Sequence, residues 1–149
     1  MAPSNNILKG GLINIQSVGN KTHEIRNLIN ESKLDFLALT ETWLYEYENA
    51  KITEMTPKTH NFWHKSRDTK KGGGIGVFLS KSFNKIRIDS TITNTYGYIK
   101  INCEYDSRHI VIVVIYRPPK TNKNEFNNEI RHFLVDKHYR HKSSNMWRF

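Results

Sequence analysis

Three polar residues stand where apolar strands are expected to be interrupted or to end, and they define the candidate chemistry. Asn14 interrupts the apolar residues around it, Glu41 follows the apolar run 34–39, and Tyr116 follows the β-branched run 110–115. A carboxylate with amide oxygens nearby suits a hard cation such as Mg²⁺, which binds through one or two carboxylates and substrate phosphates. Each residue alone is also explained as a polar strand end that meets solvent. The three together favour a metal and phosphate site.

The elements that must position these residues begin with a βαβ unit. Residues 11–17 have the alternation of a short strand, residues 22–33 carry apolar side chains at helical spacing, and residues 34–39 indicate a buried strand. A strand, helix and strand within thirty residues predict two parallel strands. Ligands gather at the carboxyl ends of such strands, where we expect Glu41.

The rest of the chain reads mainly as strands. We expect an irregular acidic segment over residues 44–57 and then strands at residues 60–65, 75–80, 85–90, 98–104 and 109–116. Asp106 and Ser107 indicate a hairpin turn between the last two. Because residues 110–115 are all β-branched, this strand is expected in the middle of a sheet, buried on both faces.

An amphipathic helix is predicted near the C-terminus. Asn122 and Glu125 have capping-box spacing, and apolar residues recur at helical spacing as far as Leu134. From Val135 the pattern fails, so residues 135–149 are expected to form a basic, poorly ordered tail. We therefore divide the chain into a domain over residues 1–134 and this tail.

The charge distribution bears on possible partners. The net charge is +9, and a basic stretch over residues 58–85 follows an acidic stretch over residues 31–57. A concentrated basic segment suits a polyanion such as DNA, because phosphate contacts release counterions. A solvated basic surface kept for solubility explains the same charges equally well. The candidate DNA contacts are Lys65, Arg67, Lys70 and Lys71.

Several classes of protein are disfavoured. The single cysteine, Cys103, gives no disulfide framework, the first residues do not resemble a signal peptide, and the longest apolar run, residues 110–116, is too short to span a membrane. We expect a soluble intracellular protein without a membrane partner. Gly72–Gly76 precedes a strand and not a helix, so it favours a tight turn over a dinucleotide-binding loop, and no small-molecule cofactor is expected.

Four segments resemble a known family. They are 12–17 (Leu-Ile-Asn-Ile-Gln-Ser), 35–44 (ending Thr-Glu-Thr-Trp-Leu), 72–78 (Gly-Gly-Gly-Ile-Gly-Val-Phe) and 115–119 (Ile-Tyr-Arg-Pro-Pro). Their order and spacing resemble the endonuclease/exonuclease/phosphatase superfamily, and most closely the apurinic-type endonuclease domain of non-LTR retrotransposons. The resemblance implies an α/β fold in which a mixed sheet is packed with helices. The chain would form the N-terminal part of the four-layer α/β-sandwich of the DNase-I-like fold, and this fold would therefore be truncated.

The resemblance also implies a role for each of the three polar residues. Glu41 would bind Mg²⁺, Asn14 would hydrogen-bond near the metal and the scissile phosphate, and Tyr116 would stabilise charge on the phosphate. The reaction implied is hydrolytic nicking of a DNA phosphodiester. Apart from the resemblance, Trp43 and Trp63 suit stacking on a base or insertion into a groove, although packing in the fold is the commoner role of such residues.

Two segments of the family pattern are missing from the sequence. The family continues into a strand ending Gly-Asp-Phe-Asn and later into an Asp-His pair, and neither occurs here. We therefore expect a truncated relative of a Mg²⁺-dependent endonuclease that is inactive or nearly so, with Mg²⁺ bound weakly. Two alternatives remain open: a non-catalytic basic module that binds nucleic acid, and a non-functional remnant of a mobile element.

Overall fold

The computed structural model describes residues 6–67 and 72–144, with only the backbone described for residues 137–144. The chain forms two compact units. The first unit comprises residues up to Ile92 together with Gly97–Tyr116, and the second comprises Thr93–Tyr96 together with the residues from Arg117 onward.

The first unit contains a four-stranded mixed sheet, called the first sheet below. Its strand order is β1-β2-β4-β3, with bounds β1 Gly10–Asn14, β2 Phe36–Thr40, β4 Ile75–Ser80 and β3 His60–Lys65. β1 and β2 are parallel, as the βαβ pattern predicted, and they are joined by the helix α1 (Thr22–Ser32). β4 runs antiparallel to both of its neighbours.

A three-stranded antiparallel sheet, the second sheet, completes the first unit. Its order is β5-β6-β7, with bounds β5 Asn84–Ile92, β6 Gly97–Tyr105 and β7 Arg108–Tyr116. The predicted hairpin is confirmed, because Tyr105 pairs with Arg108 and the connecting Asp106 and Ser107 both have positive φ.

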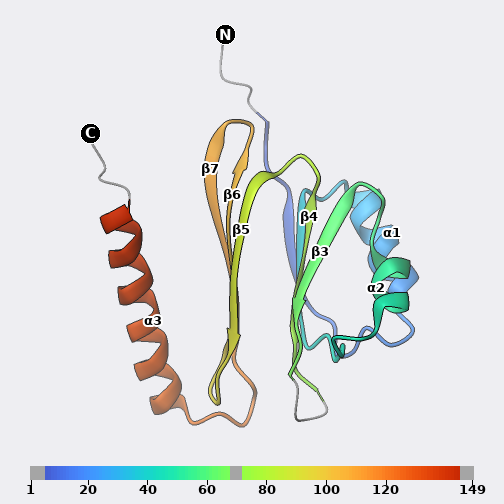
Figure 1. Cartoon of the computed structure of the whole chain (residues 1–149). Coiled ribbons are helices and arrows are strands. Elements are labelled where there is room, and N and C mark those ends of the chain that lie inside the picture. The colour runs from blue at the N-terminus through green and yellow to red at the C-terminus, as the bar shows by residue number, and fades with distance from the viewer. Residues whose placement is uncertain (1–5, 68–71, 145–149) are drawn as a thin grey trace. The chain divides into compact units, whose positions relative to one another are not determined.

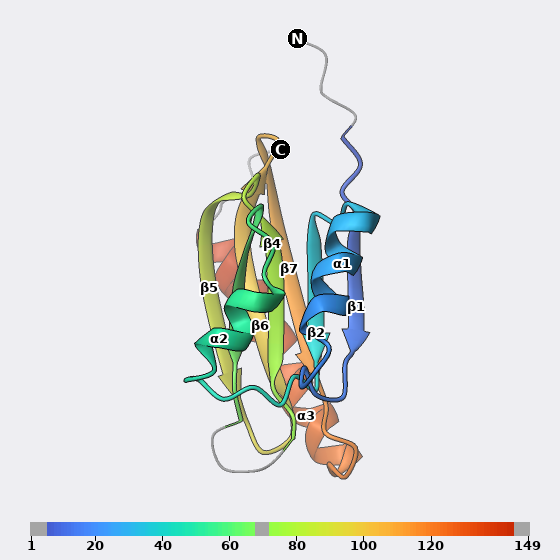
Figure 2. The ribbon, with the colours of Figure 1, turned by 90° about the vertical axis from the view of Figure 1, so that its right-hand side faces the viewer.

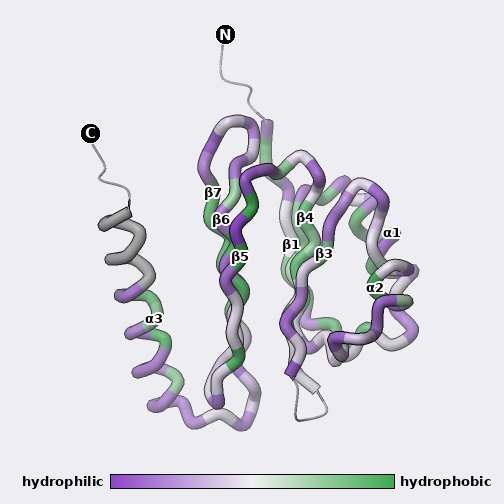
Figure 3. The backbone as a smooth tube through the Cα atoms, in the orientation of Figure 1, coloured by the Kyte–Doolittle hydropathy of each residue, from purple (hydrophilic) through white to green (hydrophobic). Residues whose placement is uncertain are grey.

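The alternation of side chains along β2 and β4 produces two apolar cores in the first unit. Leu37 and Leu39 of β2 pack with α1 and with the helix α2 (Asn49–Met55), whereas Ala38 packs toward the second sheet. Successive strand residues point to opposite faces, so the fully apolar strands have both faces covered. Figures 1 and 2 show α1 and α2 on one side of the first sheet and the second sheet along the other. Figure 3 shows the hydrophobic character of β4, which lies between the two cores.

The expectation of irregular structure over residues 44–57 was wrong in part. The short helix α2 forms within it, and its last residue, Met55, is fully buried. Its polar side chains concealed the apolar anchors, because only Ile52 and Met55 are needed to dock one face of a two-turn helix.

The expectation that the β-branched strand lies in the middle of a sheet was also wrong. In the described residues β7 is an edge strand whose ladder partner is β6. Val111 and Val113 on one face are 37% and 42% exposed, whereas Ile112 and Val114 on the other face join the core between the sheets. A continuous β-branched run favours the strand conformation but does not by itself specify burial of both faces.

The second unit is built around the helix α3 (Lys123–Ser144). The Asn122 half of the predicted capping box is confirmed, with its side chain accepting hydrogen bonds from the backbone N–H groups of Asn124 and Glu125. The expected change to non-helical structure at Val135 was wrong, because the helix continues to Ser144. The helix thus extends beyond the last residues of the apolar pattern, which shows that a helix can continue where an apolar stripe has ended. No helix in the described part of the chain is long and apolar enough to cross a membrane.

Candidate metal and phosphate site

The register of the first sheet brings its loops together at one edge. Asn14 at the end of β1 pairs with Thr40 at the end of β2, and Thr40 pairs with Ile75 at the start of β4. The carboxyl ends of the two parallel strands therefore meet there with Gly72–Gly74, which precede β4 and are called the glycine segment below. Backbone hydrogen bonds continue the contact beyond the strands, with the N–H of Ser17 donating to the carbonyl of Glu41 at 2.7 Å.

The carboxylate of Glu41 is the centre of the site. Its Oε1 accepts a hydrogen bond from the hydroxyl of Tyr116. Its Oε2 accepts two, from Nε1–H of Trp43 at 2.7 Å and from the backbone N–H of Gly73 at 3.0 Å. Hydrogen bonds to an ionised carboxylate are stronger than neutral ones. The three donors come from β7, from the loop after β2 and from the glycine segment, so the tertiary structure fixes the orientation of this carboxylate.

The backbone around Glu41 adopts conformations that are unusual for side-chain-bearing residues. Glu41 and Trp43 have φ values of 57° and 54°, in the left-handed region. Each such residue costs of order 1 kcal/mol, and this strain is concentrated at functional sites. Two backbone hydrogen bonds to the glycine segment stabilise the loop: Trp43 N–H to Gly73 O at 2.9 Å and Thr42 N–H to Gly74 O at 3.4 Å.

The glycine segment must remain glycine for two reasons. Gly73 and Gly74 have φ values of 77° and 89°, and a Cβ on Gly74 would lie 2.5 Å from the hydroxyl oxygen of buried Thr42. The strand after the segment was expected, but the hydrogen bond from Gly73 to Glu41 was not. The three consecutive glycines were the available signal, because a backbone that approaches a side chain closely requires them.

Asn14 occupies a different position from the one expected. It is the last residue of β1 rather than an interruption in the middle of the strand, and its side chain is exposed. Among the described residues no hydrogen bond joins it to Glu41. The strand register nevertheless places Asn14 at the same sheet edge, beside Thr40.

The side chains around Glu41 limit how a divalent cation could be held there. The described residues contain no group of three or more His, Cys, Asp or Glu side chains that would hold a metal ion. Glu41 therefore offers a single carboxylate, which would suit Mg²⁺ because that ion usually keeps several waters and uses one or two carboxylates together with substrate phosphates. Oε1 accepts one hydrogen bond here, and a carboxylate oxygen has two lone pairs, so it has capacity for a ligand.

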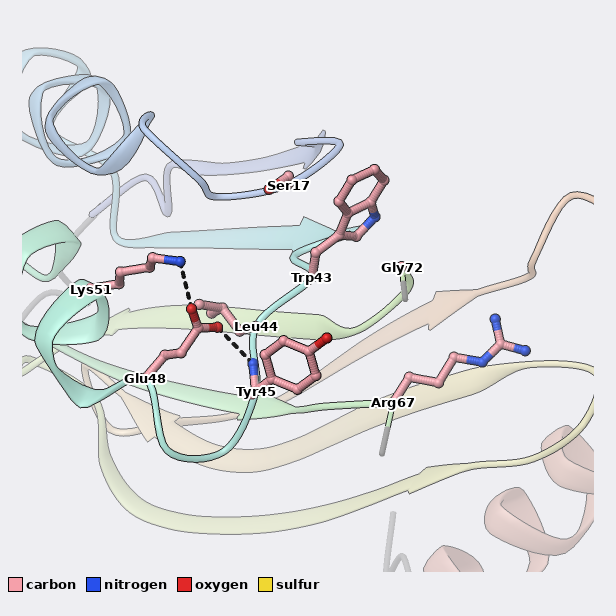
Figure 4. Close-up of a pocket in the computed structure, with 8 residues that line it drawn as sticks. All are labelled: Ser17, Trp43, Leu44, Tyr45, Glu48, Lys51, Arg67 and Gly72. Atoms are coloured by element: carbon pink, nitrogen blue, oxygen red, sulfur yellow. Dashed lines mark hydrogen bonds and ion pairs between the residues drawn. The ribbon is translucent and has the colours of Figure 1, made fainter. Parts of the chain in front are cut away.

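A pocket of about 140 Å³ lies beside the site (Figure 4). Trp43 and Tyr45 line it from the loop after β2, and Arg67 lines it from the segment after β3. Glu48 is also in the lining, and its carboxylate contacts Lys51 Nζ at 2.5 Å and accepts from the backbone N–H of Tyr45 at 2.8 Å. The hydrogen bond from Lys51 holds the pKa of Glu48 below its ordinary value, although burial opposes the shift.

The residues predicted to contact DNA are divided by the structure. Arg67 lines the pocket, whereas Lys65 at the end of β3 does not. Lys70 and Lys71 lie outside the described residues. The two tryptophans also differ, because Trp63 packs against the core between the two sheets and Trp43 is 40% exposed.

The fold and the loops at this sheet edge are those of a nuclease-like α/β protein. The sequence profile of the endonuclease/exonuclease/phosphatase family matches residues 10–147, and the chain belongs to this family. Among curated proteins none matches the sequence.

Solved structures with the same fold support the DNase-I-like class that was predicted. Truncated TDP2 from Caenorhabditis elegans has a TM-score of 0.62 at 11% identity, covering 85% of this chain and 50% of that one. TDP2 from D. rerio, complexed with a single strand DNA product, has a TM-score of 0.61 at 13% identity, covering 87% and 54%. The endonuclease domain of TRAS1, a telomere-specific non-LTR retrotransposon, has a TM-score of 0.55 at 11% identity, covering 81% and 51%. The chain thus spans about half the length of these structures.

Proposed function

We propose that this chain carries the metal- and phosphate-binding half of a Mg²⁺-dependent DNA endonuclease site and that these 149 residues alone are inactive or nearly so. The observation that carries the proposal is the Glu41 carboxylate, which is held by donors from Tyr116, Trp43 and Gly73 at the carboxyl end of β2. One carboxylate fixed in orientation and ready to share a cation with a phosphate is what such a half-site requires.

Each side chain has a distinct task in the proposed reaction. Glu41 would hold Mg²⁺, and the bound ion would polarise the phosphoryl oxygen and stabilise the leaving oxygen. Tyr116 orients Glu41 through its hydroxyl, and the same hydroxyl would stabilise charge that develops on a phosphate. Asn14 at the same edge would donate its amide N–H to the phosphate.

The proposed lack of activity follows from the groups that hydrolysis needs in addition. A water must be oriented for attack while the leaving group is stabilised, and removing one member of such a unit costs several orders of magnitude in rate. The Gly-Asp-Phe-Asn and Asp-His segments of the resembling family are not in this sequence. The described residues also contain no group of three or more His, Cys, Asp or Glu side chains that would replace them.

A substrate in the nucleic-acid class is supported by the relatives and by charge. One structure of this fold is in complex with single-strand DNA and another is an endonuclease domain. The chain has a net charge of +9, and Arg67 lies beside the site. These observations favour DNA over a small uncharged substrate.

Two measurements on the full chain test the proposal. Isothermal titration with MgCl₂ should show weak binding that Glu41→Gln abolishes and Glu24→Gln, an exposed glutamate on α1, leaves unchanged. Supercoiled plasmid with Mg²⁺ should show no nicking above the Glu41→Gln background. Magnesium binding that is indifferent to Glu41 would remove the metal site, and strong nicking that depends on Glu41 would refute the claim of inactivity.

A second function is favoured by the pocket: a non-catalytic module that binds nucleic acid. Arg67 is the member of the predicted basic set that lines the pocket. Binding to DNA should weaken as salt rises, with a slope that falls when Lys65, Arg67, Lys70 and Lys71 are neutralised together. Affinity that does not change with salt would exclude this function.

A further inference from the structure

The loop that follows Glu41 exposes an unusual series of aromatic side chains. Trp43, Tyr45 and Tyr47 are 40%, 43% and 77% exposed, whereas Leu44 between them is buried in the core under the helices. Single exposed apolar residues are ordinary, but a contiguous exposed group marks a surface that binds something. Three exposed rings therefore lie within six residues of Glu41, the candidate metal ligand.

These rings are held in place before any ligand binds. The indole of Trp43 is fixed by its hydrogen bond to Glu41, and the rings of Tyr45 and Tyr47 are stacked at 5.4 Å between centroids with an interplanar angle of 6°. The backbone of Tyr45 is fixed by a hydrogen bond from its N–H to Glu48. Fixed rings lose little conformational entropy on binding, which favours affinity.

The pocket between Trp43, Tyr45 and Arg67 has the size and chemistry for one flat ring beside an anion (Figure 4). Its volume of about 140 Å³ is smaller than the roughly 300–1,000 Å³ of sites for whole drug-sized ligands. Lys51 neutralises Glu48, and in the described part of the chain Arg67 has no ion-pair partner. The pocket therefore combines aromatic faces with a guanidinium that is available for a phosphate.

We propose that Trp43 and Tyr45 bind one unpaired nucleobase of a single-stranded nucleic acid, while Arg67 contacts the phosphate beside that base. Every base has a π-face, so stacking on aromatic side chains tolerates all sequences and adds to backbone electrostatics. A base in a duplex is already stacked and paired, which makes an unpaired base the better ligand. The inference rests on the proposed function, because it extends the candidate metal and phosphate site at Glu41 to the neighbouring nucleotide.

The test compares oligonucleotides that differ in bases or strandedness. Fluorescence anisotropy on the full chain without Mg²⁺ should show that dT₁₀ binds about tenfold more tightly than a chain of ten abasic deoxyribose phosphates, consistent with the strength of base stacking. A blunt duplex of the same length should also bind more weakly than dT₁₀. Either DNA or RNA has the required base and phosphate, so the same measurement with rU₁₀ in place of dT₁₀ decides which single strand binds more tightly.

Matched variants assign the effect to the pocket. Tyr45→Ala should weaken dT₁₀ binding about tenfold and remove the preference over the abasic chain, whereas Tyr45→Phe should retain both. Arg67→Ala should weaken the binding of both dT₁₀ and the abasic chain. Lys81→Ala should weaken the binding of neither, because Lys81 follows β4 at the opposite end of the first sheet. Trp43 is left unchanged because it also holds Glu41.

The outcomes separate this inference from the proposed function. Equal affinity for dT₁₀ and the abasic chain, or unchanged affinity for dT₁₀ in Tyr45→Ala, overturns the proposed base stacking but leaves the proposed phosphate contact in place. Tighter binding of the duplex also overturns it. Binding of no oligonucleotide at all overturns both the stacking and the proposed nucleic-acid function.

Discussion

The hydroxyl of Tyr116 at the end of β7 donates a hydrogen bond to Oε1 of Glu41, which follows β2, so this contact joins the two sheets at the candidate site. The two residues are 75 positions apart in the sequence. The orientation of the carboxylate therefore depends on the packing of the second sheet against the first. A change in that packing would alter the site without touching Glu41.

The first prediction concerns the strength of this contact. Tyr116→Phe removes only the hydroxyl, and a double-mutant cycle with Glu41→Gln should give a coupling of about 1 kcal/mol in the free energy of unfolding, measured with urea. Hydrogen bonds to charged groups contribute about 1.5–3 kcal/mol, and partial exposure reduces this. The exposed pair Lys85–Glu104, at 2.8 Å, should give a smaller coupling. Additive effects of the Tyr116 and Glu41 substitutions would show that the contact does not stabilise the fold.

The second prediction separates backbone strain from steric clash in the glycine segment. Gly72 and Gly74 have similar φ values, 95° and 89°, but only Gly74 has a side-chain atom within 3.0 Å of an added Cβ. Gly72→Ala should cost about 1 kcal/mol through strain alone, and Gly74→Ala about 2–3 kcal/mol because Thr42 must also move. Thermal unfolding of the two variants measures the difference. Equal costs would mean that Thr42 moves aside without loss.

The third prediction is a pH dependence that arises from His64 on β3. Burial lowers the pKa of His64 from 6.5, although Glu46 and Glu48 act in the opposite direction, and its Nδ1 has no hydrogen-bond partner among the described residues. As the pH falls below about 6.5 the unfolded chain takes up a proton before the folded chain does, so the unfolded state gains stability. The contribution of neutral His64 to the free energy of unfolding is therefore fully present above about pH 6.5, and it is lost as the pH falls toward the folded-state pKa.

Urea unfolding between pH 5.5 and 7.5 measures this effect. His64→Gln should flatten the dependence of the unfolding free energy on pH, and His109→Gln, an exposed histidine on β7, should not. A wild-type slope that persists in His64→Gln would assign the dependence to other groups.

The fourth prediction concerns the exposed side of β7. In the described residues β7 is an edge strand with Val111 and Val113 exposed, and apolar edges of this kind promote association. Val113→Lys should reduce self-association in sedimentation velocity while leaving the unfolding free energy within about 0.5 kcal/mol of wild type. Ile112→Lys, on the buried face of the same strand, should instead destabilise the fold strongly. A wild-type chain that is monomeric at all concentrations would contradict the predicted association through β7. It would also count against the interpretation of the chain as a non-functional remnant of a mobile element.

Much of the fold was predictable from local patterns. The βαβ unit, the strands after His60 and the hairpin at Asp106 follow from residue periodicity and turn chemistry, and the structure confirms them. The helix α2 and the second half of α3 were missed, because polar residues extend or form helices without a clear apolar stripe. The expected burial of both faces of β7 was wrong, because strand propensity describes the strand and not its neighbours.

The sequence by itself determined the residue types of the site and the ends of the strands that carry them. The short motifs around Glu41 and Tyr116 indicated the family, and the family profile confirms it. Only the tertiary structure decided which groups touch. It placed Tyr116, Trp43 and Gly73 on the Glu41 carboxylate and left Asn14 without a hydrogen bond to it among the described residues. The physical reason is that hydrogen-bond partners are set by strand register and by positive-φ loops, and these depend on the packing of two sheets that local sequence does not encode.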